Sequence, residues 1–301
     1  MLIVQPAALN EFKRRLSWAE IDFSKISPLL KICVSEDIEN KGDVTSEVCK
    51  IKNTGVAALV SREEMVVCGL PLIPLIIEEF HETSIHVENI KLDGEKIPEK
   101  TTIAYLHGKQ KDILLVERTI LNFVQRLSGI ATLTNQFSSI LDKYEVGLLD
   151  TRKTTPGHRI LEKYATSCGG GYNHRMNLSD RILIKDNHLA SQKINSSKCL
   201  SSFLKEIIQN ADHAILEVEI DQISYLEPAI EAGVDAILLD NFTASDVEKA
   251  VLINNNRVVL EASGGINLNT LEIFAKSKPH FISSGAPIHR SRWIDIGLDW
   301  I

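Results

Sequence analysis

Two patterns of apolar and polar positions follow one another along the chain. In the first third, short apolar runs are separated by turn-forming segments such as "LDGEKIPEK" at 92–100, and this predicts short strands. We expect these strands at residues 56–60, 64–68, 85–90 and 102–106. Apolar residues at helical spacing predict helices at about 71–80 and 111–126. This part of the chain therefore has the pattern of an α+β domain.

From about residue 146 onwards, strand-like apolar runs alternate with helical segments such as 243–254. The runs are "VGLLD", "RILIKD", "AILEVEID", "DAILLDN", "VVLEAS" and "FISSG". Regular alternation of this kind predicts parallel βα units and a barrel-like α/β domain. Neither low-complexity sequence nor a Gly/Ser linker marks the join, so we place a soft boundary near residue 128.

Each of these apolar runs finishes on a polar residue. The final positions are Asp150, Lys185, Glu219, Asp240, Ser263 and Ser284, and a further polar segment, "YNHRM", lies at 172–176. One such residue alone is best explained as a cap or a turn residue. In an α/β barrel, however, the carboxyl ends of all the strands surround one mouth, where active sites lie. The repetition therefore predicts a functional site at that mouth.

Two glycine-containing loops follow the last two runs. "SGGIN" at 263–267 and "SSGAP" at 283–287 each place serine and glycine directly after a strand. Backbone amides there can approach an anion closely, and barrels often bind phosphate after their final strands. We expect a phosphate group at these loops.

The expected mouth also concentrates positive charge. Residues 150–188 carry seven basic and four acidic residues, a net charge of +3, although the whole chain has a formal charge of −7. Strand ends bring Arg152, Lys153 and Lys185 to the mouth, and the polar segment adds His174 and Arg175. Cations crowded in a cleft repel one another until a polyanion binds.

Three further bases fall on helical or flanking positions, so we expect them to be solvated surface residues: Arg159, Lys163 and Arg181. Glu219 and Asp240 are expected opposite the cations. Carboxylates there suit Mg²⁺ held jointly with phosphates, or a positive charge that develops on the substrate.

Composition excludes several other classes of protein. With 44% apolar and 24% charged residues, the 301-residue chain is globular in character, and its apolar runs are too short to span a bilayer. The N-terminal residues lack the apolar stretch of a signal peptide, so we expect a cytoplasmic protein without a membrane partner. The acidic balance disfavours a nucleic-acid partner. Five widely spaced cysteines, without a C-x-x-C pair, favour neither a disulfide framework nor a zinc site, and we expect mostly buried, reduced thiols.

Long blocks of the sequence closely resemble the quinolinate phosphoribosyltransferase family. They are "EDIENKGDVTS" (36–46), "ERTILNFVQRLSGIAT" (117–132), "DTRKTTPGHRILEKYAT" (150–166), "GGGYNHRMNLSDRILIKDNH" (169–188), "LEVEID" (216–221), "ILLDNF" (237–242), "EASGGIN" (261–267) and "IDIGLDWI" (294–301). The resemblance covers nearly the whole chain.

The resemblance implies a fold and an activity. It implies an N-terminal α/β sandwich domain at 1–128, an incomplete seven-stranded α/β barrel at 129–287, and a tail at about 288–301 that returns to the first domain. The family enzymes are homodimers that join quinolinate to phosphoribosyl pyrophosphate with Mg²⁺. They release pyrophosphate and CO₂ and leave nicotinate mononucleotide, a precursor of NAD.

The resemblance also implies a set of site residues. Arg152, Arg175, Lys153, His174 and Lys185, together with Thr151, would hold the two carboxylates and the pyrophosphate, and Arg118 would arrive from the other subunit. Glu219 and Asp240 would lie at the ribose and would be the ligands of Mg²⁺. Lys153, Lys185, Glu219 and Asp240 would be the catalytic residues. The 5′-phosphate would lie against Ser263, Gly264, Gly265, Ser284, Gly285 and Ala286.

Three alternatives remain open from the sequence. A sister phosphoribosyltransferase would act on a monocarboxylate such as nicotinate. A Schiff-base aldolase would use Lys153 or Lys185, because a cationic mouth depresses the pKa of an amine. A non-catalytic phosphosugar-binding module is disfavoured by Glu219 and Asp240, which repel a polyanion unless a metal or chemistry requires them.

Overall fold

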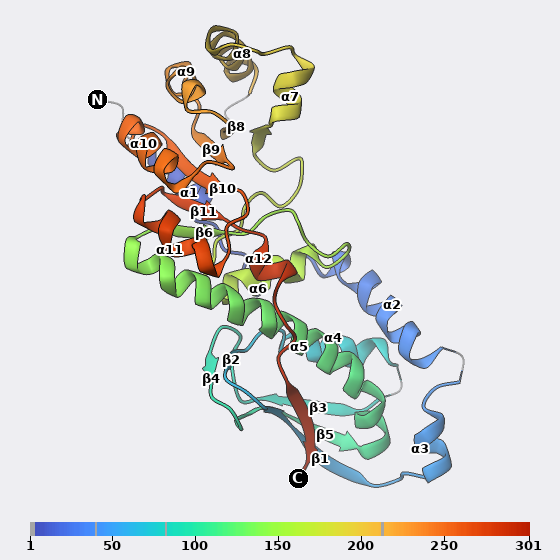
Figure 1. The fold of residues 1–301 in the computed structure, drawn as a ribbon. Helices are drawn as coiled ribbons and strands as arrows, with labels where there is room; N and C mark the ends of the chain where they lie inside the picture. Colours follow the sequence, from blue (N-terminus) through green and yellow to red (C-terminus); the bar gives the residue numbers. More distant parts are fainter. Residues whose placement is uncertain (1–3, 40, 82, 212–213) are drawn as a thin grey trace. The chain divides into compact units, whose positions relative to one another are not determined.

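The computed structural model describes residues 4–39, 41–81, 83–211 and 214–301 (Figure 1). Asn40, within the quoted segment 36–46, lies outside the described residues. The chain forms two compact units. The parallel unit comprises Met1–Arg15, Gln136–Lys153 and Gly171–Ala286, and the antiparallel unit comprises Leu16–Asn135, Thr154–Gly170 and Pro287–Ile301.

The parallel unit is built on a six-stranded parallel sheet. In the order β6-β11-β10-β9-β8-β7, its strands are Gly147–Leu149, Phe281–Ser283, Val259–Ser263, Ala236–Asp240, Leu216–Ile220 and Ile182–Ile184. Nearly all of their residues are buried, which explains the continuous apolar runs in the sequence. Beyond β6, the seventh expected strand is a single parallel bridge between Leu149 and Tyr172. The sheet is thus an incomplete α/β barrel, as predicted.

Helices connect these strands in the same unit (Figure 1). They are α7 (Asp186–Ser191), α8 (Ser197–Asn210), α9 (Leu226–Ala232), α10 (Ala244–Asn254) and α11 (Leu268–Lys276). Polar caps set their starts: the side chains of Ser196 and Thr243 accept hydrogen bonds from backbone amides of the first turns of α8 and α10.

The short helix α1 (Pro6–Phe12) covers one end of the parallel sheet. Its Ala8 and Phe12 are buried against the residues that begin three strands, Ala236, Val259 and Phe281. The rings of Phe12 and Phe281 stack with centroids 5.5 Å apart. Helix α1 thus covers the amino ends of these strands, and the carboxyl ends at the opposite edge are not covered by it.

The antiparallel unit has a four-stranded sheet besides its helices, which confirms the α+β domain expected in the first part of the chain. Its order is β12-β1-β5-β3, and the strands are Ile296–Trp300, Thr54–Ser61, Thr102–Lys109 and Ile85–Asn89. The last strand of the chain, β12, therefore pairs with the first strand, β1. A second, two-stranded sheet pairs β2 (Met65–Val66) with β4 (Lys96–Ile97), so the segment 92–100 contains a short strand besides its turn.

Helices α2 (Ser27–Ile38), α3 (Val44–Cys49), α4 (Leu72–Glu79) and α6 (Arg159–Cys168) belong to this unit, and α5 (Gln110–Leu141) belongs to it as far as Asn135. The helix expected at 111–126 thus continues through Ser128 and Gly129. Gly129 lies within this helix and does not end it. A glycine is required at this position because a side chain would collide with the backbone of Arg292. Among the described helices, none has both the length and the apolar character needed to cross a membrane.

Candidate active site

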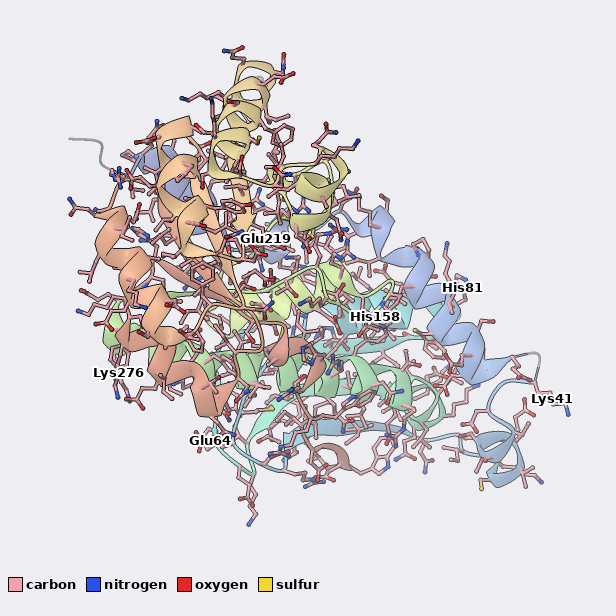
Figure 2. All side chains as sticks on the ribbon, turned by 45° about the horizontal axis from the view of Figure 1, so that its top comes forward. Lys41, Glu64, His81, His158, Glu219 and Lys276 are labelled. Atoms are coloured by element: carbon pink, nitrogen blue, oxygen red, sulfur yellow. The ribbon has the colours of Figure 1, made fainter. Side chains whose placement is uncertain are left out.

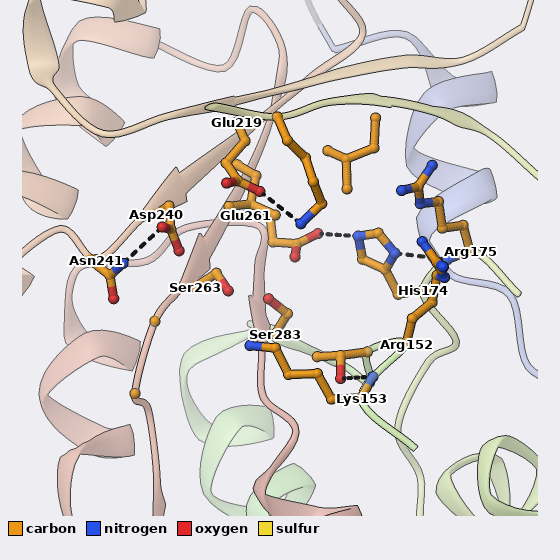
Figure 3. Close-up of a pocket in the computed structure, with 16 residues that line it drawn as sticks. Arg152, Lys153, His174, Arg175, Glu219, Asp240, Asn241, Glu261, Ser263 and Ser283 are labelled. Carbon is orange, nitrogen blue, oxygen red and sulfur yellow. Dashed lines mark hydrogen bonds and ion pairs between the residues drawn. The ribbon is translucent and has the colours of Figure 1, made fainter. Parts of the chain in front are cut away.

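The carboxyl ends of the parallel strands surround a pocket of about 370 Å³ (Figure 3). Five of the six strands line it with residues near their carboxyl ends or directly after them, and β6 is followed by the lining residues Thr151–Lys153. The lining residues are Thr151, Arg152, Lys153, His174, Arg175, Leu183, Lys185, Glu219, Leu238, Asp240, Asn241, Glu261, Ser263, Gly264, Gly265 and Ser283. The structure therefore brings together residues that are more than a hundred positions apart in the sequence.

Guanidinium groups gather on one side of this pocket. Figure 3 shows Arg152 and Arg175 beside His174, away from Glu219 and Asp240. Burial and the nearby charge of Arg152 lower the pKa of Arg175. Among the described residues, the buried Nε atoms of both arginines have no hydrogen-bond partner. Buried donors of this kind are normally satisfied, so this side of the pocket is suited to an anionic ligand.

Carboxylates occupy the other side. Burial raises the pKa of Glu219, against the opposing charge of Lys185, whose Nζ lies 3.3 Å from Glu219 Oε2. Burial likewise raises the pKa of Asp240, while the charges of Lys153 and Lys185 oppose that rise. Glu219 lies among the strand ends, in contrast to Lys276 on the outer surface of α11 in the same unit (Figure 2).

The loop after β10 approaches the backbone of its neighbour closely. Gly264 has a φ of 109°, and a Cβ atom there would lie 2.8 Å from the backbone of Asn241, so a larger residue would displace the loop. Asn241 itself has a φ of 57° and donates from Nδ2 to Asp240 Oδ2 at 2.7 Å. Close packing of two loops thus fixes the orientation of the Asp240 carboxylate.

His174 contacts two buried glutamates that were not predicted from the sequence: Glu261, which also lines the pocket, and Glu217, which does not. His174 Nε2 lies 3.4 Å from Glu217 Oε2 and 3.5 Å from Glu261 Oε2, and both glutamates are fully buried. Burial and the charge of Glu217 raise the pKa of Glu261 well above its usual value. For Glu217, the charges of His174 and Arg181 outweigh burial and lower the pKa. The sequence does contain a pattern that could have predicted them. Glu217 and Glu261 each lie two residues before a predicted site residue, and side chains two positions apart share one face of a strand.

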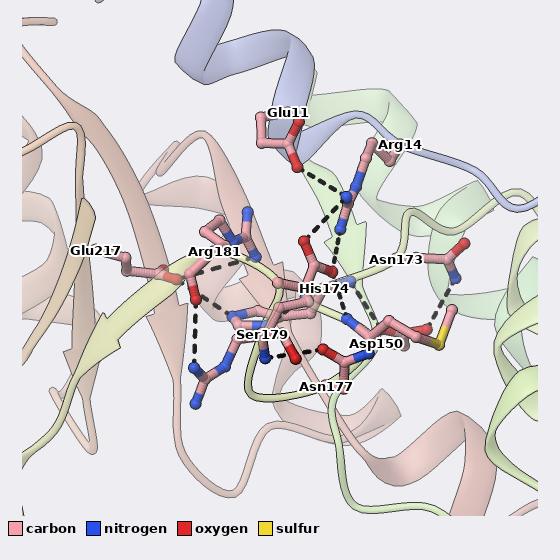
Figure 4. A network of polar contacts seen from close by, with 12 residues as sticks. Glu11, Arg14, Asp150, Asn173, His174, Asn177, Ser179, Arg181 and Glu217 are labelled. Atoms are coloured by element: carbon pink, nitrogen blue, oxygen red, sulfur yellow. Dashed lines mark hydrogen bonds and ion pairs between the residues drawn. The ribbon is translucent and has the colours of Figure 1, made fainter. Parts of the chain in front are cut away.

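Asp150 anchors the segment that carries His174. It is buried, and its carboxylate accepts hydrogen bonds from Asn173 Nδ2 at 2.9 Å and from the amide of His174 at 2.8 Å (Figure 4). His174 Nδ1 in turn accepts the amide hydrogen of Arg175 at 2.8 Å. Asp150 therefore orients the cationic segment instead of lining the pocket itself.

The three bases expected on the surface are not solvated, so that expectation was wrong. Lys163 is fully buried, Arg181 is 8% exposed, and Arg159 is half-buried and donates to Thr154 Oγ1. The guanidinium of Arg181 lies 3.9 Å from the ring centroid of Phe12 and 3.9 Å from Glu217 Oε2. A basic residue next to a strand or helix is therefore not necessarily exposed, because an aromatic ring and a buried carboxylate can bind its charged group inside the protein.

Four of the expected site residues do not line the pocket. Ser284 is buried and its hydroxyl donates to the carbonyl of Ile266 at 2.7 Å, while Gly285 and Ala286 continue the chain beyond it. Arg118 lies exposed on α5 in the antiparallel unit. The lining residues that were not expected are Leu183, Leu238, Asn241, Glu261 and Ser283.

Comparison with known proteins identifies the family. The family models for the N-terminal and C-terminal domains of quinolinate phosphoribosyl transferase match residues 43–128 and 130–299. A probable nicotinate-nucleotide pyrophosphorylase (carboxylating) of Bacillus subtilis is 38% identical over 278 residues, which are 91% of this chain and 93% of that protein. Quinolinate phosphoribosyltransferase (decarboxylating) 1b of Nicotiana tabacum is 34% identical over 90% of this chain and 81% of its own.

Solved structures agree. The nicotinate-nucleotide pyrophosphorylase from Francisella tularensis superposes with a TM-score of 0.86 at 36% identity, covering 94% of this chain and 98% of that one. The enzyme from Ehrlichia chaffeensis gives a TM-score of 0.85, also at 36% identity, over 94% of this chain and 100% of that one. With both domain models matched and the two-unit fold shared, the chain belongs to the quinolinate phosphoribosyltransferase family.

Proposed function

We propose that the pocket at the strand ends is where this decarboxylating phosphoribosyltransferase joins quinolinate to phosphoribosyl pyrophosphate. The products are nicotinate mononucleotide, pyrophosphate and CO₂, as in the biosynthesis of NAD. The observation that carries this proposal is the separation of charge in the pocket. Two arginines with unpartnered Nε atoms lie on one side, and two carboxylates lie on the other.

The arginine side suits the two carboxylates of quinolinate. Arg152 and Arg175 can each give a charge-assisted, bidentate contact, which is the strongest common way to hold a carboxylate. Thr151, Lys153 and Lys185 lie in the same lining and can hold the remaining anionic oxygens, including those of pyrophosphate. His174 holds this side in place, because its ring nitrogens lie against the amide of Arg175 and the two buried glutamates.

The carboxylate side suits the ribose. When the bond from the anomeric carbon to pyrophosphate breaks, positive charge develops on the ribose ring, and Glu219 and Asp240 can stabilise it. The ring nitrogen of quinolinate then bonds to that carbon and becomes quaternary. As the adjacent carboxylate leaves as CO₂, the electron pair remains on the ring carbon beside the cationic nitrogen until a proton adds there. The protein thus acts mainly by positioning and by charge, without a covalent nucleophile.

A magnesium ion fits the same carboxylates. Mg²⁺ binds through one or two carboxylates together with the phosphates of a substrate, and Glu219 and Asp240 offer such a pair. Lys185 lies against Glu219 and would have to move away or turn toward the leaving pyrophosphate. When bound, the ion would neutralise charge that develops on the pyrophosphate.

For the 5′-phosphate, the loop Ser263–Gly265 is the better supported site. Its three residues line the pocket, and the two glycines leave the backbone open to an anion. Ser284, Gly285 and Ala286 stay a proposal. The Ser284 hydroxyl already donates to Ile266, the Ser284 amide to Leu149 and the Ala286 amide to Ser284 Oγ, so a phosphate there would have to use the Gly285 amide or displace one of these bonds.

An isotope experiment tests the proposed reaction. Quinolinate labelled in the 2-carboxyl group is incubated with the purified chain, phosphoribosyl pyrophosphate and Mg²⁺. We expect one labelled CO₂ per nicotinate mononucleotide, no release without phosphoribosyl pyrophosphate, and no nucleotide from nicotinate offered in its place. Nucleotide formation from nicotinate without CO₂ would replace this function with that of the sister enzyme.

We also propose a cytoplasmic homodimer in which Arg118 completes the pocket of the partner subunit. Arg118→Ala and Lys185→Ala homodimers should each be nearly inactive. A co-refolded mixture contains heterodimers with one doubly defective site and one intact site, so activity should return toward roughly a quarter of wild type if half of the dimers are mixed. Heterodimers that form but remain inactive would place Arg118 within its own subunit or outside the site.

A further inference from the structure

A second cluster of potential ligands lies in the antiparallel unit. Cys68 follows β2, Asp93 lies in the loop between β3 and β4, and Cys168 is the last residue of α6. One donor atom from each, two sulfurs and a carboxylate oxygen, lies within 4.8 Å of the other two. The five cysteines were expected to be mostly buried. In fact Cys68 alone is buried, Cys33 and Cys168 are half-buried, and Cys49 and Cys199 are exposed.

The carboxylate of this cluster is held firmly in place. Asp93 Oδ2 accepts hydrogen bonds from the amide of Gly69 at 2.7 Å and from the hydroxyl of Tyr164 at 2.9 Å, and Oδ1 accepts one from the amide of Leu70 at 3.1 Å. Gly69 has a φ of 105°, which turns its amide toward Asp93 directly after Cys68. Partners of this kind orient the ligands of metal sites in proteins.

The charges of the cluster are not balanced by any cation in the described part of the chain. No lysine, arginine or histidine there forms an ion pair with Asp93. Burial raises the pKa of both Asp93 and Cys68, and the carboxylate and the second thiol raise that of Cys68 further. A bound divalent cation would supply the positive charge that this part of the chain does not.

We propose that Cys68, Cys168 and Asp93 form a binding site for a thiophilic divalent cation, of which Zn²⁺ is the best match. Two thiolates and one carboxylate are ordinary zinc ligands, and sulfur ligands select against Mg²⁺ and Ca²⁺. Two sulfurs in a tetrahedral zinc site lie ~3.8 Å apart, so donor atoms that already lie within 4.8 Å of one another need to shift by only about 1 Å to close around the ion. The partial exposure of Asp93 and Cys168 leaves an entry path and room for water as a fourth ligand.

Bound metal would join three segments that are distant in sequence: the turn after β2, the loop before β4 and the end of α6. A ligand that binds the folded state alone stabilises it, so the metal would strengthen the antiparallel unit. The cluster is a different site from the strand-end pocket, and metal binding there does not depend on the proposed reaction.

The test uses the full chain, reduced and freed of metal by a chelator, with Co²⁺ and Zn²⁺ as probes. We expect one equivalent of Co²⁺ to give the near-ultraviolet band of a thiolate-to-metal transition, and Zn²⁺ to displace it. C68S and C168S should each lose the band and weaken Zn²⁺ binding at least tenfold. Y164F, which removes a hydrogen bond to the Asp93 ligand, should weaken binding about 10- to 100-fold.

Matched controls separate this site from other ligands. C49S removes an exposed cysteine of the same unit and should leave the band unchanged. Metal held at Glu219 and Asp240 would give no thiolate band. Because Cys68 is fully buried, C68S could fail to fold, and the half-buried Cys168 then decides: Zn²⁺ should raise the melting temperature of the wild type but not of C168S. Three results would overturn the proposal. The first is a cobalt complex without the thiolate band, and the second is equal Zn²⁺ affinity in C168S. The third is a reduced chain that binds no metal and forms a Cys68–Cys168 disulfide when it is oxidised.

Discussion

Two groups of buried charges, one around Glu162 in the antiparallel unit and one at the pocket of the parallel unit, differ in how their hydrogen bonds are satisfied. In the antiparallel unit, the buried carboxylate of Glu162 accepts from Arg126 Nη2 at 2.9 Å, from the Thr155 hydroxyl at 2.8 Å and from the Thr155 amide at 2.9 Å. Arg126 donates further hydrogen bonds to Ser291 and to the carbonyl of Ile288. In the parallel unit, Arg152 and Arg175 keep Nε atoms without partners among the described residues.

This difference separates structural charges from functional ones. A buried ion pair whose remaining donors and acceptors are also satisfied holds segments together, and its removal costs stability. Charges that face one another across a pocket with donors left over are arranged for a ligand that supplies the missing partners. Variants in the pocket should therefore change catalysis with little effect on folding, and variants of Glu162 should do the reverse.

The largest effect is expected from the pocket carboxylates. Glu219→Gln and Asp240→Asn keep the shape of each side chain and remove its charge, so stabilisation of the cationic transition state is lost. We expect kcat to fall by about 10²–10³-fold while KM changes much less. Steady-state kinetics measure this, and unchanged circular dichroism serves as the control. Normal turnover in both variants would show that the two residues are structural caps.

A smaller effect is expected from the arginines of the pocket. Arg152→Ala or Arg175→Ala should weaken quinolinate binding by about 1.5–3 kcal/mol, because each removes charge-assisted hydrogen bonds to a carboxylate. Lysine at either position should restore binding only in part, since it lacks the planar fork. Isothermal titration measures the affinity. Lys276→Ala removes an exposed cation of the same unit and should bind quinolinate normally, so equal losses in this control would point to nonspecific electrostatics.

The opposite pattern is expected from Glu162→Gln. This change breaks the charged contact to Arg126 and should lower the free energy of unfolding by about 2 kcal/mol. Urea denaturation measures it, and kcat and KM of the folded enzyme should remain close to wild type. If kcat falls as far as in the pocket variants, the distinction between the two units fails.

The smallest effect is expected from Asp180, which accepts hydrogen bonds from Arg14 Nη1 at 3.1 Å and Nη2 at 2.6 Å. Burial opposes ionisation, but the hydrogen bonds and charge of Arg14 prevail and lower the pKa of Asp180. A carboxyl whose folded-state pKa is lowered adds stability above its unfolded pKa, about 3.9, and loses it as the pH falls through the folded value. Asp180→Asn should therefore cost about 1 kcal/mol at pH 7, a modest figure because the pair is partly exposed.

The pH dependence supplies the check for Asp180. The difference in urea midpoint between wild type and Asp180→Asn should shrink steadily below about pH 4. A difference that is constant from pH 7 to pH 3 would mean that the variant acts through packing and not through charge.

The rule that strands of an α/β barrel end at one mouth was enough to predict much of the pocket. Lys185, Glu219, Asp240 and Ser263 follow from it directly, because each ends or follows an apolar run. The same rule gave no basis for placing α1 over the other end of the sheet, since a helix of seven residues is too short to show a clear apolar period in the sequence.

Contacts between residues that are distant in the sequence could not be predicted from the pattern of apolar and polar positions. Glu217 and Glu261 look like ordinary strand residues until the parallel register sets them on one face beside His174. Likewise, Cys68 and Cys168 lie a hundred positions apart, and only the packing of α6 against the loop of Asp93 brings them together. Pairing of this kind depends on tertiary structure, which local periodicity does not encode.

A crystal structure of the chain with quinolinate bound tests the central claim most directly. We expect the two carboxylates of quinolinate to lie within hydrogen-bond distance of the Arg152 and Arg175 guanidinium groups, with the ring nitrogen directed toward Glu219 and Asp240. We also expect the unpartnered Nε atoms to acquire partners. Quinolinate bound elsewhere, or in this pocket with both arginines still unpartnered, would contradict it.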